Sequence, residues 1–261
     1  MNVLVTGATA GIGLETARAL ARLGHTVWVH GRSDASAGRA AEALRGDLPS
    51  SSLVPISADL SSLAAVRGLG EALRGVELDV VVHNAGVWMQ TPTRTVDGFE
   101  TTWAVNHLAP FLLTQLLLDG LLQRPEARVI TVSSIGHRSG TIHFDDVNLS
   151  DRFDGITAYC QSKLANVLFT QELARRAAGT SLIACSLHPG VIQTKLLART
   201  GFGNQATESP AAGARTSVFL ATTPAPTSGA YYVRERPVAP RIPDPSVDRR
   251  LWELSERQTQ A

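Results

Sequence analysis

Short apolar segments rich in β-branched residues alternate along this chain with longer segments of helical periodicity. The short segments are typical of strands and span residues 3–6, 26–30, 53–57, 80–83, 128–133 and 182–187. The longer segments are typical of helices and span residues 12–23, 35–44, 61–73, 96–122, 158–177 and 210–221. Because the strands are apolar at nearly every position, we expect both faces of their sheet to be buried, as in parallel sheets.

The regular alternation of strand and helix predicts an α/β fold with a doubly wound parallel sheet of the Rossmann type. The first helix carries a one-sided apolar stripe and ends at Gly24, a residue suited to a helix C-cap. No internal repeat or low-complexity linker divides the sequence. We therefore expect a single domain over residues 1–261, with a C-terminal tail from about residue 234 that lies on the surface.

The charge balance points to a small-molecule partner. Lys and Arg number 24 against 23 Asp and Glu, which leaves a formal net charge of +1. Such a chain has no strong field to attract nucleic acid or an anionic membrane. The longest apolar stretches, such as residues 111–122, are interrupted by polar residues and are shorter than the roughly 20 residues of a membrane helix, so no span is predicted.

The two cysteines, Cys160 and Cys185, lie in apolar segments without a CxxC pair or clustered histidines. Neither a disulfide framework nor a metal site is therefore expected. The first seven residues lead directly into a strand, without the basic and apolar regions of a secretory signal. These features favour a cytoplasmic protein.

A glycine-rich turn joins the first strand to the first helix. It reads Thr-Gly-Ala-Thr-Ala-Gly-Ile-Gly over residues 6–13, where backbone N–H groups and a helix N-terminus meet a pyrophosphate in dinucleotide-binding folds. An ordinary tight turn is the alternative, since glycine also serves that purpose. The predicted cofactor contacts in this turn are Gly7, Thr9, Ala10, Gly11, Ile12 and Gly13.

The Gly-x-x-x-Gly-x-Gly spacing behind a threonine resembles that of the short-chain dehydrogenase/reductase family. Four further segments in the same order extend the resemblance over roughly residues 2–233. It implies an enzyme that uses a nicotinamide dinucleotide to interconvert a carbonyl and an alcohol. Hydride then passes between the nicotinamide and the carbonyl carbon, while a tyrosine exchanges a proton with the oxygen.

Tyr159 and Lys163 form the family's Tyr-x-x-x-Lys motif, and their spacing puts both side chains on one helix face. A nearby ammonium favours the phenolate, so we expect Lys163 to bring the pKa of Tyr159 toward neutrality. Ser134, the second serine at the end of the fifth strand, matches the hydroxyl that orients the substrate oxygen. Asn106 matches the residue that anchors a proton-relay water, with a helix kink or a core hydrogen bond as the alternative.

The choice between NADP(H) and NAD(H) depends on the end of the second strand. Gly31 offers no carboxylate to a ribose hydroxyl, whereas Arg32 offers a guanidinium suited to a 2′-phosphate. We therefore expect a preference for NADP(H), with NAD(H) still possible, although Arg32 as a solvated side chain is the alternative. Asp59 and Leu60 match the family's adenine-contacting pair, unless Asp59 or Ser61 is a helix N-cap.

Two more segments complete the predicted cofactor site. His83-Asn84-Ala85-Gly86 resembles the family's Asn-Asn-Ala-Gly segment with His83 as a departure, and residues 187–194 resemble its Pro-Gly turn. The cofactor contacts implied by these two segments are Asn84, Ala85, Gly86, Pro189, Gly190 and Thr194.

The longer segment between Ser134 and Tyr159, together with Ser162-Lys163-Leu164-Ala165-Asn166, resembles the retinol-dehydrogenase-like branch. A lipophilic carbonyl or alcohol is the expected substrate. Residues that would line its pocket are apolar or aromatic, and they are Trp88, Met89, His137, Phe144, Phe153, Leu196, Leu197 and Phe202.

Two other functions compete with this prediction. A sugar-nucleotide epimerase or dehydratase of the extended branch would show different glycine spacing and a larger C-terminal domain. A non-catalytic NADP-binding regulator would have lost Tyr159 or Lys163, which this chain retains. The resemblance also implies a homo-oligomer, a dimer or tetramer formed through the helices that hold Asn106 and Tyr159.

Overall fold

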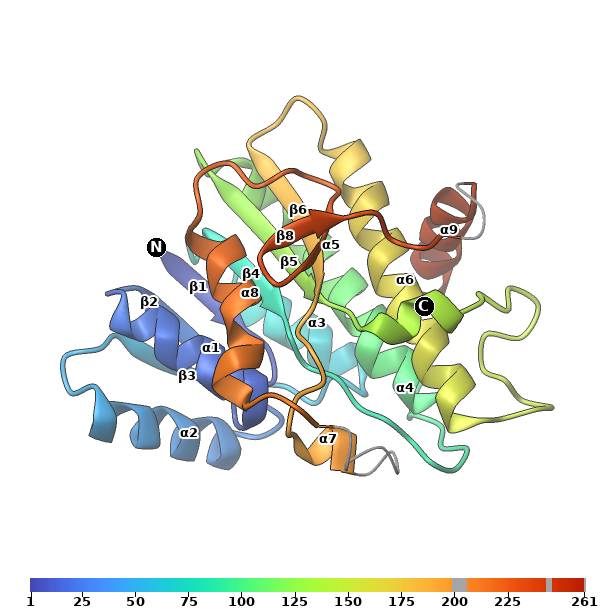
Figure 1. Ribbon diagram of the computed structural model, residues 1–261, viewed down its shortest axis with the longest axis horizontal. Coiled ribbons are helices and arrows are strands. Elements are labelled where there is room, and N and C mark those ends of the chain that lie inside the picture. Colours follow the sequence, from blue (N-terminus) through green and yellow to red (C-terminus); the bar gives the residue numbers. More distant parts are fainter. Residues whose placement is uncertain (199–205, 243–245, 261) are drawn as a thin grey trace.

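The computed structural model describes residues 1–198, 206–242 and 246–260, and its strands form one eight-stranded sheet in the order β3-β2-β1-β4-β5-β6-β7-β8 (Figure 1). Neighbouring strands from β3 to β7 are parallel, and β8 is antiparallel to β7. The strands are β1 (Asn2–Val5), β2 (Thr26–Gly31), β3 (Leu53–Ser57), β4 (Val80–His83), β5 (Ala127–Val132), β6 (Leu182–His188), β7 (Tyr231–Val233) and β8 (Arg236–Val238). The predicted doubly wound α/β fold is confirmed.

All six predicted strands are present, and each end lies within one residue of its predicted position. The short strands β7 and β8 were not predicted. The segment from about residue 234, predicted as a tail, contains β8 and ends in a helix, α9 (Val247–Thr259).

The helices alternate with the strands as predicted, except that the helix predicted over residues 96–122 begins later. The helices are α1 (Gly11–Arg22), α2 (Asp34–Asp47), α3 (Leu63–Ala72), α4 (Thr101–Trp103), α5 (Ala109–Leu122), α6 (Gly155–Arg176), α7 (Lys195–Ala198) and α8 (Pro210–Thr222). A π-helical turn, η1 (Ala104–Leu108), joins α4 to α5, and a 3-10 turn, η2 (Ile135–Ser139), follows β5.

The helix predicted over residues 96–122 is wrong in its first five residues. Glu100 is the N-cap, and its carboxylate accepts hydrogen bonds from the backbone N–H groups of Thr102 and Trp103, both at 2.7 Å. The carboxylate satisfies N–H groups that a helix start leaves without partners, so the helix begins after residue 100.

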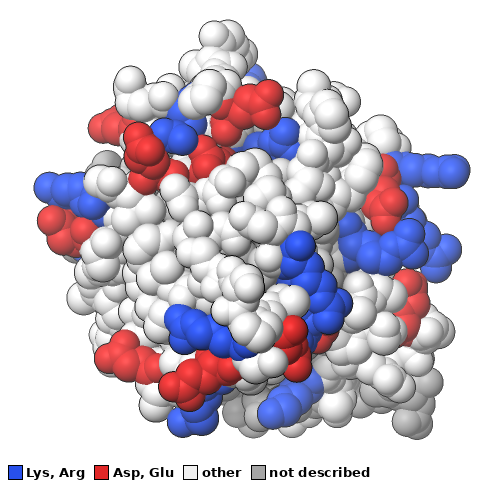
Figure 2. All heavy atoms as spheres, turned by 90° about the vertical axis from the view of Figure 1, so that its left-hand side faces the viewer, with Lys and Arg blue, Asp and Glu red and all other residues white. Residues whose placement is uncertain are grey.

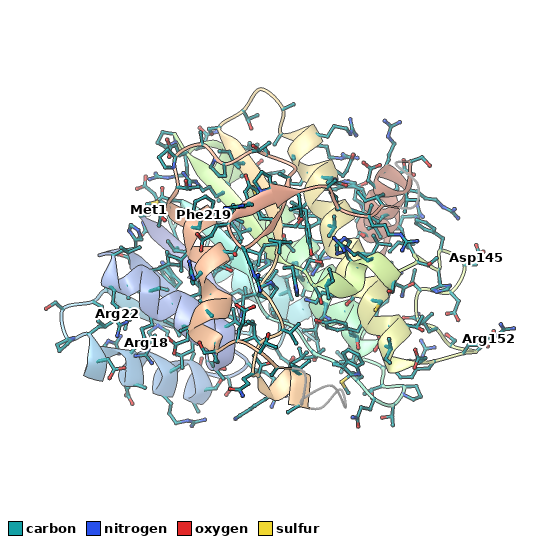
Figure 3. All side chains as sticks on the ribbon, in the orientation of Figure 1. Met1, Arg18, Arg22, Asp145, Arg152 and Phe219 are labelled. Atoms are coloured by element: carbon teal, nitrogen blue, oxygen red, sulfur yellow. The ribbon has the colours of Figure 1, made fainter. Side chains whose placement is uncertain are left out.

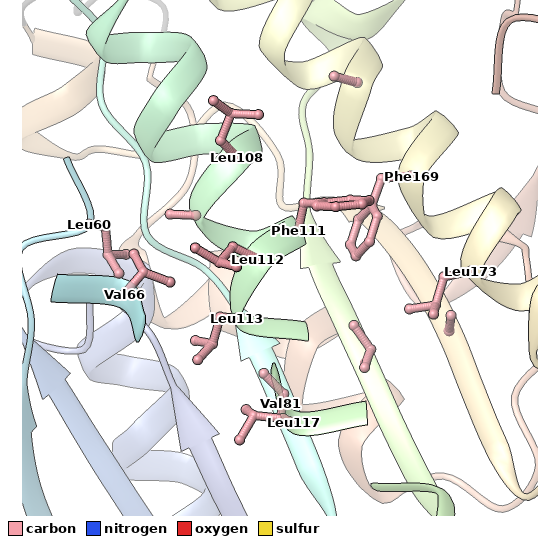
Figure 4. Close-up of a cluster of buried hydrophobic side chains, with 14 of the residues drawn as sticks. Leu60, Val66, Val81, Leu108, Phe111, Leu112, Leu113, Leu117, Phe169 and Leu173 are labelled. Atoms are coloured by element: carbon pink, nitrogen blue, oxygen red, sulfur yellow. The ribbon is translucent and has the colours of Figure 1, made fainter. Parts of the chain in front are cut away.

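Two apolar clusters fill the space between the sheet and its helices. Helices α1, α2 and α8 cover one face, and α3, α5 and α6 cover the other. Figure 4 shows part of the second cluster, where Leu112, Leu113 and Leu117 of α5 lie near Val66 of α3 and Val81 of β4. Burial of apolar surface contributes roughly 25 cal/mol per Å² to stability, and it stabilises the packing of these helices on the sheet.

The C-terminal helix α9 packs on the outer side of α5 and α6. Trp252 contacts Phe111 of α5 at 4.9 Å between ring centroids and Phe169 of α6 at 6.0 Å. The guanidinium of Arg176 lies 4.3 Å from the centroid of the Trp252 ring. Helix α9 therefore extends the second apolar cluster beyond the two central helices.

The segment Thr101–Leu122 is long and apolar enough to cross a membrane by length and composition alone. Its most apolar window is 67% buried inside the protein, where α5 packs against α3 and the sheet. This burial is that of a core helix, so its hydropathy is weak evidence for a membrane span.

Charged side chains of both signs lie close together on the surface. Figure 2 shows them scattered around one face of the molecule, with Lys and Arg next to Asp and Glu and a mostly uncharged centre. Arg18 and Arg22 project from α1, and Arg18 forms an ion pair with Asp47 (Figure 3). Asp145 and Arg152 lie at the opposite side of the molecule, on the segment that leads into α6.

Candidate active site

The carboxyl edge of the sheet brings together the segments predicted to form the site. Strand β1 is paired with β4 and β5 with β6, through pairs that include Val5 with Val82 and Val132 with Leu187. Residues 6–13, 84–86, 134 and 189–194 therefore follow neighbouring strand ends. Helix α6 adds Tyr159 and Lys163, and the Nζ of Lys163 donates a hydrogen bond to the Val132 carbonyl at 3.0 Å.

The glycine turn has a shape that larger residues would prevent. Gly7 and Gly11 have φ values of +65° and +56°, in the left-handed region that favours glycine. A Cβ on Gly13 would lie 2.4 Å from the Gly7 carbonyl oxygen, so only glycine fits there. Ala10, the N-cap of α1, provides no side-chain hydrogen bond to the helix. The first N–H groups of α1 have no side-chain cap among the described residues, which suits an anion such as a dinucleotide phosphate.

Thr6 and Asn84 fasten this turn to the segment after β4. The Thr6 hydroxyl accepts hydrogen bonds from the N–H groups of Asn84 at 3.0 Å and Ala85 at 3.1 Å. The side-chain amide of Asn84 donates to the carbonyl oxygens of Thr6 at 2.8 Å and Gly7 at 3.3 Å. The Asn84 side chain was predicted as a cofactor contact, and its amide group is hydrogen-bonded within the turn itself.

Tyr159 lies between Trp88 and Ser134. Its ring stacks on that of Trp88 at 4.7 Å between centroids. The Oγ of Ser134 and the Cε1 of the Tyr159 ring both lie 3.6 Å from a Cβ built on Gly136, so the two side chains are neighbours. Burial raises the pKa of Tyr159 to about 12, and the neighbouring Ser134 side chain acts in the opposite direction. In the protein alone, the pKa of the phenol is thus raised rather than lowered.

Lys163 is the neighbouring basic group, and burial makes its protonated form less stable. Its Nζ lies 5.6 Å from the centroid of the Tyr159 ring, and its side chain is 3% exposed. Burial lowers the pKa of Lys163 to about 8, because the ammonium is poorly solvated there. A Cβ on Gly86 would lie 3.4 Å from this Nζ, so the absence of a side chain at position 86 keeps the space beside the amine open.

Ser134 is held by groups that the sequence did not single out for this role. Its carbonyl oxygen accepts a hydrogen bond from the Tyr231 hydroxyl at 3.2 Å and lies 2.7 Å from the Nδ1 of His137. Since a carbonyl only accepts, Nδ1 carries the proton, and the Nε2 atom is free to accept the N–H of Arg241 at 3.4 Å. His137 was predicted to line the substrate pocket, but it is fully buried and supports Ser134.

Asn106 lies in the π-helical turn η1 and is fully buried. Its Oδ1 accepts the N–H of Val87 at 2.8 Å, and its Nδ2 donates to the Val87 carbonyl and the Ser162 hydroxyl, both at 3.0 Å. The amide therefore links the segment after β4 to α6. Single π-helical turns occur often at functional sites, where they re-aim one residue.

The end of β2 places Arg32 beside the glycine turn. A Cβ on Gly31 would lie 2.8 Å from the Cγ2 of Thr9, so the two segments touch. Arg32 itself is exposed. Ser33 follows as the N-cap of α2, and its side chain accepts the N–H of Ser36.

Asp59 and Leu60 differ in their surroundings. One oxygen of the exposed Asp59 accepts hydrogen bonds from the N–H and the hydroxyl of Ser61, at 2.9 and 2.7 Å. Leu60 is buried in the apolar cluster under α3. The alternative of a helix N-cap at Asp59 or Ser61 is wrong, because Ser62 caps α3 by accepting the N–H of Ala65.

The Pro-Gly turn after β6 approaches the glycine turn. Gly190 has a φ of +105°, and the Cγ2 of Thr194 lies 3.5 Å from a Cβ built on Gly11. The Thr194 hydroxyl accepts the N–H of Leu197 at the start of α7. A cavity of about 320 Å³ lies beside this segment, lined by Gln193, Thr194, Lys195, Leu197, Ala198 and Ala206.

Of the residues predicted to line the substrate pocket, some lie beside Tyr159 and the start of α6, and others lie elsewhere. Trp88 stacks on Tyr159, and the Met89 carbonyl lies against Gly155 at the start of α6. Phe144 instead packs against the apolar cluster, with the guanidinium of Arg250 3.9 Å from its ring centroid. Phe202 lies outside the described residues. Within the described part of the chain, no group of three or more His, Cys, Asp or Glu side chains is arranged to hold a metal ion.

A family model described as short chain dehydrogenase matches residues 1–203 of this sequence. The chain belongs to this family. Retinol dehydrogenase 14 of Mus musculus is 40% identical over 282 residues, which cover 98% of this chain and 84% of that relative. The crystal structure of an uncharacterised protein from Mycobacterium paratuberculosis covers 100% of this chain and 93% of its own, at 35% identity and a TM-score of 0.84.

This short-chain dehydrogenase thus falls in the retinol-dehydrogenase-like branch, as predicted. It is an NAD(P)-dependent oxidoreductase that acts on CH–OH groups and interconverts carbonyls and alcohols of small molecules. A further solved neighbour is a gluconate 5-dehydrogenase from Beutenbergia cavernae, described as NAD(P)-dependent and with NADP bound at low occupancy. It is 25% identical, covers 84% of this chain and 88% of its own, and has a TM-score of 0.70.

Proposed function

We propose that this short-chain dehydrogenase uses NADP(H) to interconvert a lipophilic ketone or aldehyde and its alcohol, with Asn106, Ser134, Tyr159 and Lys163 as its catalytic group. The observation that carries the proposal is the position of the Tyr159 ring next to the Ser134 Oγ and 5.6 Å from the buried amine of Lys163. Two hydroxyls held together at the sheet edge can bind one substrate oxygen between them.

Each side chain has one task in this proposal. The nicotinamide, when bound, supplies or accepts the hydride. The Tyr159 hydroxyl gives its proton to the carbonyl oxygen during reduction and takes it back during oxidation. The Ser134 hydroxyl donates a hydrogen bond to the same oxygen, and the Lys163 ammonium stabilises the phenolate that remains.

The pKa values of the two groups give them, near neutral pH, the protonation states that reduction requires. With a pKa of about 12, Tyr159 keeps its proton and can donate it, and with a pKa of about 8, Lys163 is mostly protonated. Oxidation requires phenolate, which a charged Lys163 favours. Asn106 holds Val87 and Ser162 and so fixes the segment after β4 against α6.

The preference for NADP(H) rests on Arg32. Its guanidinium is exposed at the end of β2, beside the glycine turn, and Gly31 offers no carboxylate that would repel a 2′-phosphate. The measurement is kcat/KM with NADPH and with NADH, for the wild type and for Arg32→Ala. Equal or better use of NADH by the wild type would contradict this part of the proposal.

A lipophilic substrate is supported by the residues beside Tyr159. Trp88 covers the phenol ring, and Leu197 of α7 lines the cavity next to Thr194. The relative from Mus musculus is named for retinol, a long apolar alcohol. The test is a panel of aromatic, terpenoid and long-chain aldehydes and ketones, retinal among them, against small polar carbonyls such as glyceraldehyde. Best turnover of the small polar compounds would overturn this part.

The catalytic proposal is tested with Tyr159→Phe, which keeps the ring against Trp88 and removes the hydroxyl. NADPH affinity should stay within about threefold of the wild type, while kcat should fall by at least about 100-fold, as for loss of a general acid. Tyr232→Phe, the same change at a buried tyrosine of β7 whose hydroxyl accepts the N–H of Thr227, is the comparison. A Tyr159→Phe enzyme that retains more than a tenth of kcat contradicts the assigned role.

A homo-oligomer is part of the proposal, with a specific interface. Helix α9 packs on α5 and α6 through Trp252, so an assembly through these two helices includes α9 in its contact surface. The oligomeric mass in solution, measured by light scattering, tests whether such an assembly forms.

A further inference from the structure

His30 is the last but one residue of β2, and its side chain is 2% exposed. Strand β2 is paired with β1 so that Val29 lies opposite Val5. His30 therefore lies next to the point where β1 turns into the glycine-rich segment. Neither the catalytic group nor the predicted cofactor contacts include this residue.

His30 binds two consecutive N–H groups of the glycine turn. The N–H of Gly7 donates to the Nδ1 of the imidazole at 3.2 Å, and the N–H of Ala8 donates to the His30 carbonyl at 2.9 Å. These two N–H groups point into the protein and are used there. The N–H groups left for a phosphate belong to the residues that follow, up to the first turn of α1.

The backbone of Gly7 is held from both sides of β1. His30 of β2 accepts its N–H, and Asn84, after β4, donates to its carbonyl oxygen at 3.3 Å. Gly7 also has a positive φ, a conformation that a free chain adopts only part of the time. The two side chains together select the backbone orientation on which the rest of the turn depends.

Only one form of the imidazole can accept the Gly7 N–H. The Nδ1 atom must carry a lone pair, so the ring must be neutral with its proton on Nε2. Burial favours this form, since it lowers the pKa of His30 to about 4. The contact is therefore made over the whole neutral pH range.

The same strand end carries the residue proposed to select NADP(H). Gly31 touches Thr9 of the turn, and Arg32 follows directly. A shift of the turn relative to β2 would change the distance between the pyrophosphate site and Arg32. His30 is the side chain that joins these two parts through a hydrogen bond.

The structure assigns to His30 the role of a positioning residue for the dinucleotide: its neutral Nδ1 fixes the Gly7 peptide and thereby the phosphate-binding turn relative to β2. This role rests on dinucleotide binding by the family and not on the choice between NADP(H) and NAD(H). It concerns binding and not the proton transfer at Tyr159.

The test compares His30→Asn with His30→Gln. The side-chain oxygen of asparagine can occupy the position of Nδ1, whereas that of glutamine reaches the position of Nε2. Both replacements are polar and neutral. The dissociation constants of NADPH and NADH are measured by fluorescence titration without substrate, for both variants and the wild type, with His83→Asn as the control. His83 is a second buried imidazole, hydrogen-bonded to Thr114 and not to the turn.

We expect His30→Asn to bind within about threefold of the wild type and His30→Gln to bind about tenfold more weakly, the effect of one lost hydrogen bond. Hydrogen exchange of the Gly7 amide in the free protein should be faster in His30→Gln alone. At saturating dinucleotide, kcat of His30→Gln should match that of the wild type.

Equal affinities of the Asn and Gln variants, or unchanged exchange at Gly7, would overturn the assignment. A weakening in His83→Asn as large as in His30→Gln would also overturn it, because any buried histidine would then have the same effect. A wild type that binds neither dinucleotide would instead contradict the proposed function.

Discussion

The side-chain amide of Asn106 exchanges two hydrogen bonds with the backbone of Val87, one in each direction, at 2.8 and 3.0 Å. The Asn106 side chain thus pairs with the backbone of the segment after β4 in the way that a neighbouring strand would. The third hydrogen bond, to the Ser162 hydroxyl, ties this segment to the helix that carries Tyr159 and Lys163.

Replacement of Asn106 by Leu should therefore affect both stability and rate. The partly buried Val87 N–H and carbonyl groups would lose their partners, at a cost of up to about 1–3 kcal/mol for each group left unpaired. We expect the free energy of unfolding in urea to fall by about 2–4 kcal/mol, and kcat to fall at temperatures where the variant stays folded. An unfolding free energy equal to that of the wild type would show that these bonds add nothing.

Gly13 and Gly38 should respond in opposite ways to the same substitution. A Cβ on Gly13 would lie 2.3 Å from the Nδ2 of Asn84, whereas a Cβ on Gly38 of α2 meets no atom within 4 Å. Gly13→Ala should weaken NADPH binding by about 10- to 100-fold, as expected when overpacking costs 1–3 kcal/mol. Gly38→Ala should leave binding unchanged and raise the free energy of unfolding by about 0.5–1 kcal/mol. Equal NADPH affinity in the two variants would count against the turn as a binding site.

Histidines with lowered pKa values should make the protein sensitive to acid. Burial lowers the pKa of His30 and His188 to about 4 and those of His83 and His107 to about 3, and it also lowers the pKa of His137. Between pH 6.5 and these values the unfolded chain binds protons that the folded protein does not, so stability falls as the pH falls. Each group contributes about 1.4 kcal/mol per pH unit in this window.

Urea denaturation at pH 7, 6 and 5 measures this slope. His107→Phe removes one of these groups and should make the slope shallower by about one proton. A stability that stays constant from pH 7 to pH 5 would contradict the pKa directions on which the prediction rests.

The turn between β7 and β8 should tolerate a change that stabilises it. Arg234 and Glu235 both have positive φ values, +48° and +64°, which asparagine and glycine adopt at lower cost. The double variant Arg234→Asn, Glu235→Gly should raise the free energy of unfolding by about 1 kcal/mol. It loses exposed ion pairs to Glu208 and Arg215, which contribute little. A fall in stability would mean that these ion pairs outweigh the backbone strain.

Trp252 should be the main anchor of α9. Its truncation to Ala removes ring contacts with Phe111 and Phe169 and should cost about 3–5 kcal/mol. Glu253→Ala, on the exposed side of the same helix, should change stability by less than about 0.5 kcal/mol. Thermal unfolding of the two variants distinguishes an anchored helix from a loosely attached one, for which both would unfold like the wild type.

The sequence predicted the six longer strands to within one residue because they are apolar runs of four to seven residues between turn-forming segments. Strands β7 and β8 have three residues each, too few to show a period. The π-helical turn around Asn106 was also not predicted, since one inserted residue hardly alters an apolar pattern that spans the whole of α5. Helix α9 follows a proline-rich stretch that suggested an irregular tail.

The candidate site residues were found from motif spacing, which places them at strand ends, but not from their contacts. Spacing does not reveal that the Asn84 amide lies within the glycine turn, or that His137 and Tyr231 hold the Ser134 carbonyl. The upward shift in the pKa of Tyr159 depends on how deeply the phenol and Lys163 are buried, which only the packing of Trp88 and α6 decides.

Both edges of the sheet carry a proline in the middle of the outermost strand, Pro55 in β3 and Pro237 in β8. Proline has no N–H to offer to a further strand, and both residues are exposed. Another molecule that tries to add its own strand at either edge meets an interrupted row of donors. Association through β-augmentation is thereby discouraged at both ends of the sheet, so the proposed homo-oligomer would have to form through helical surfaces.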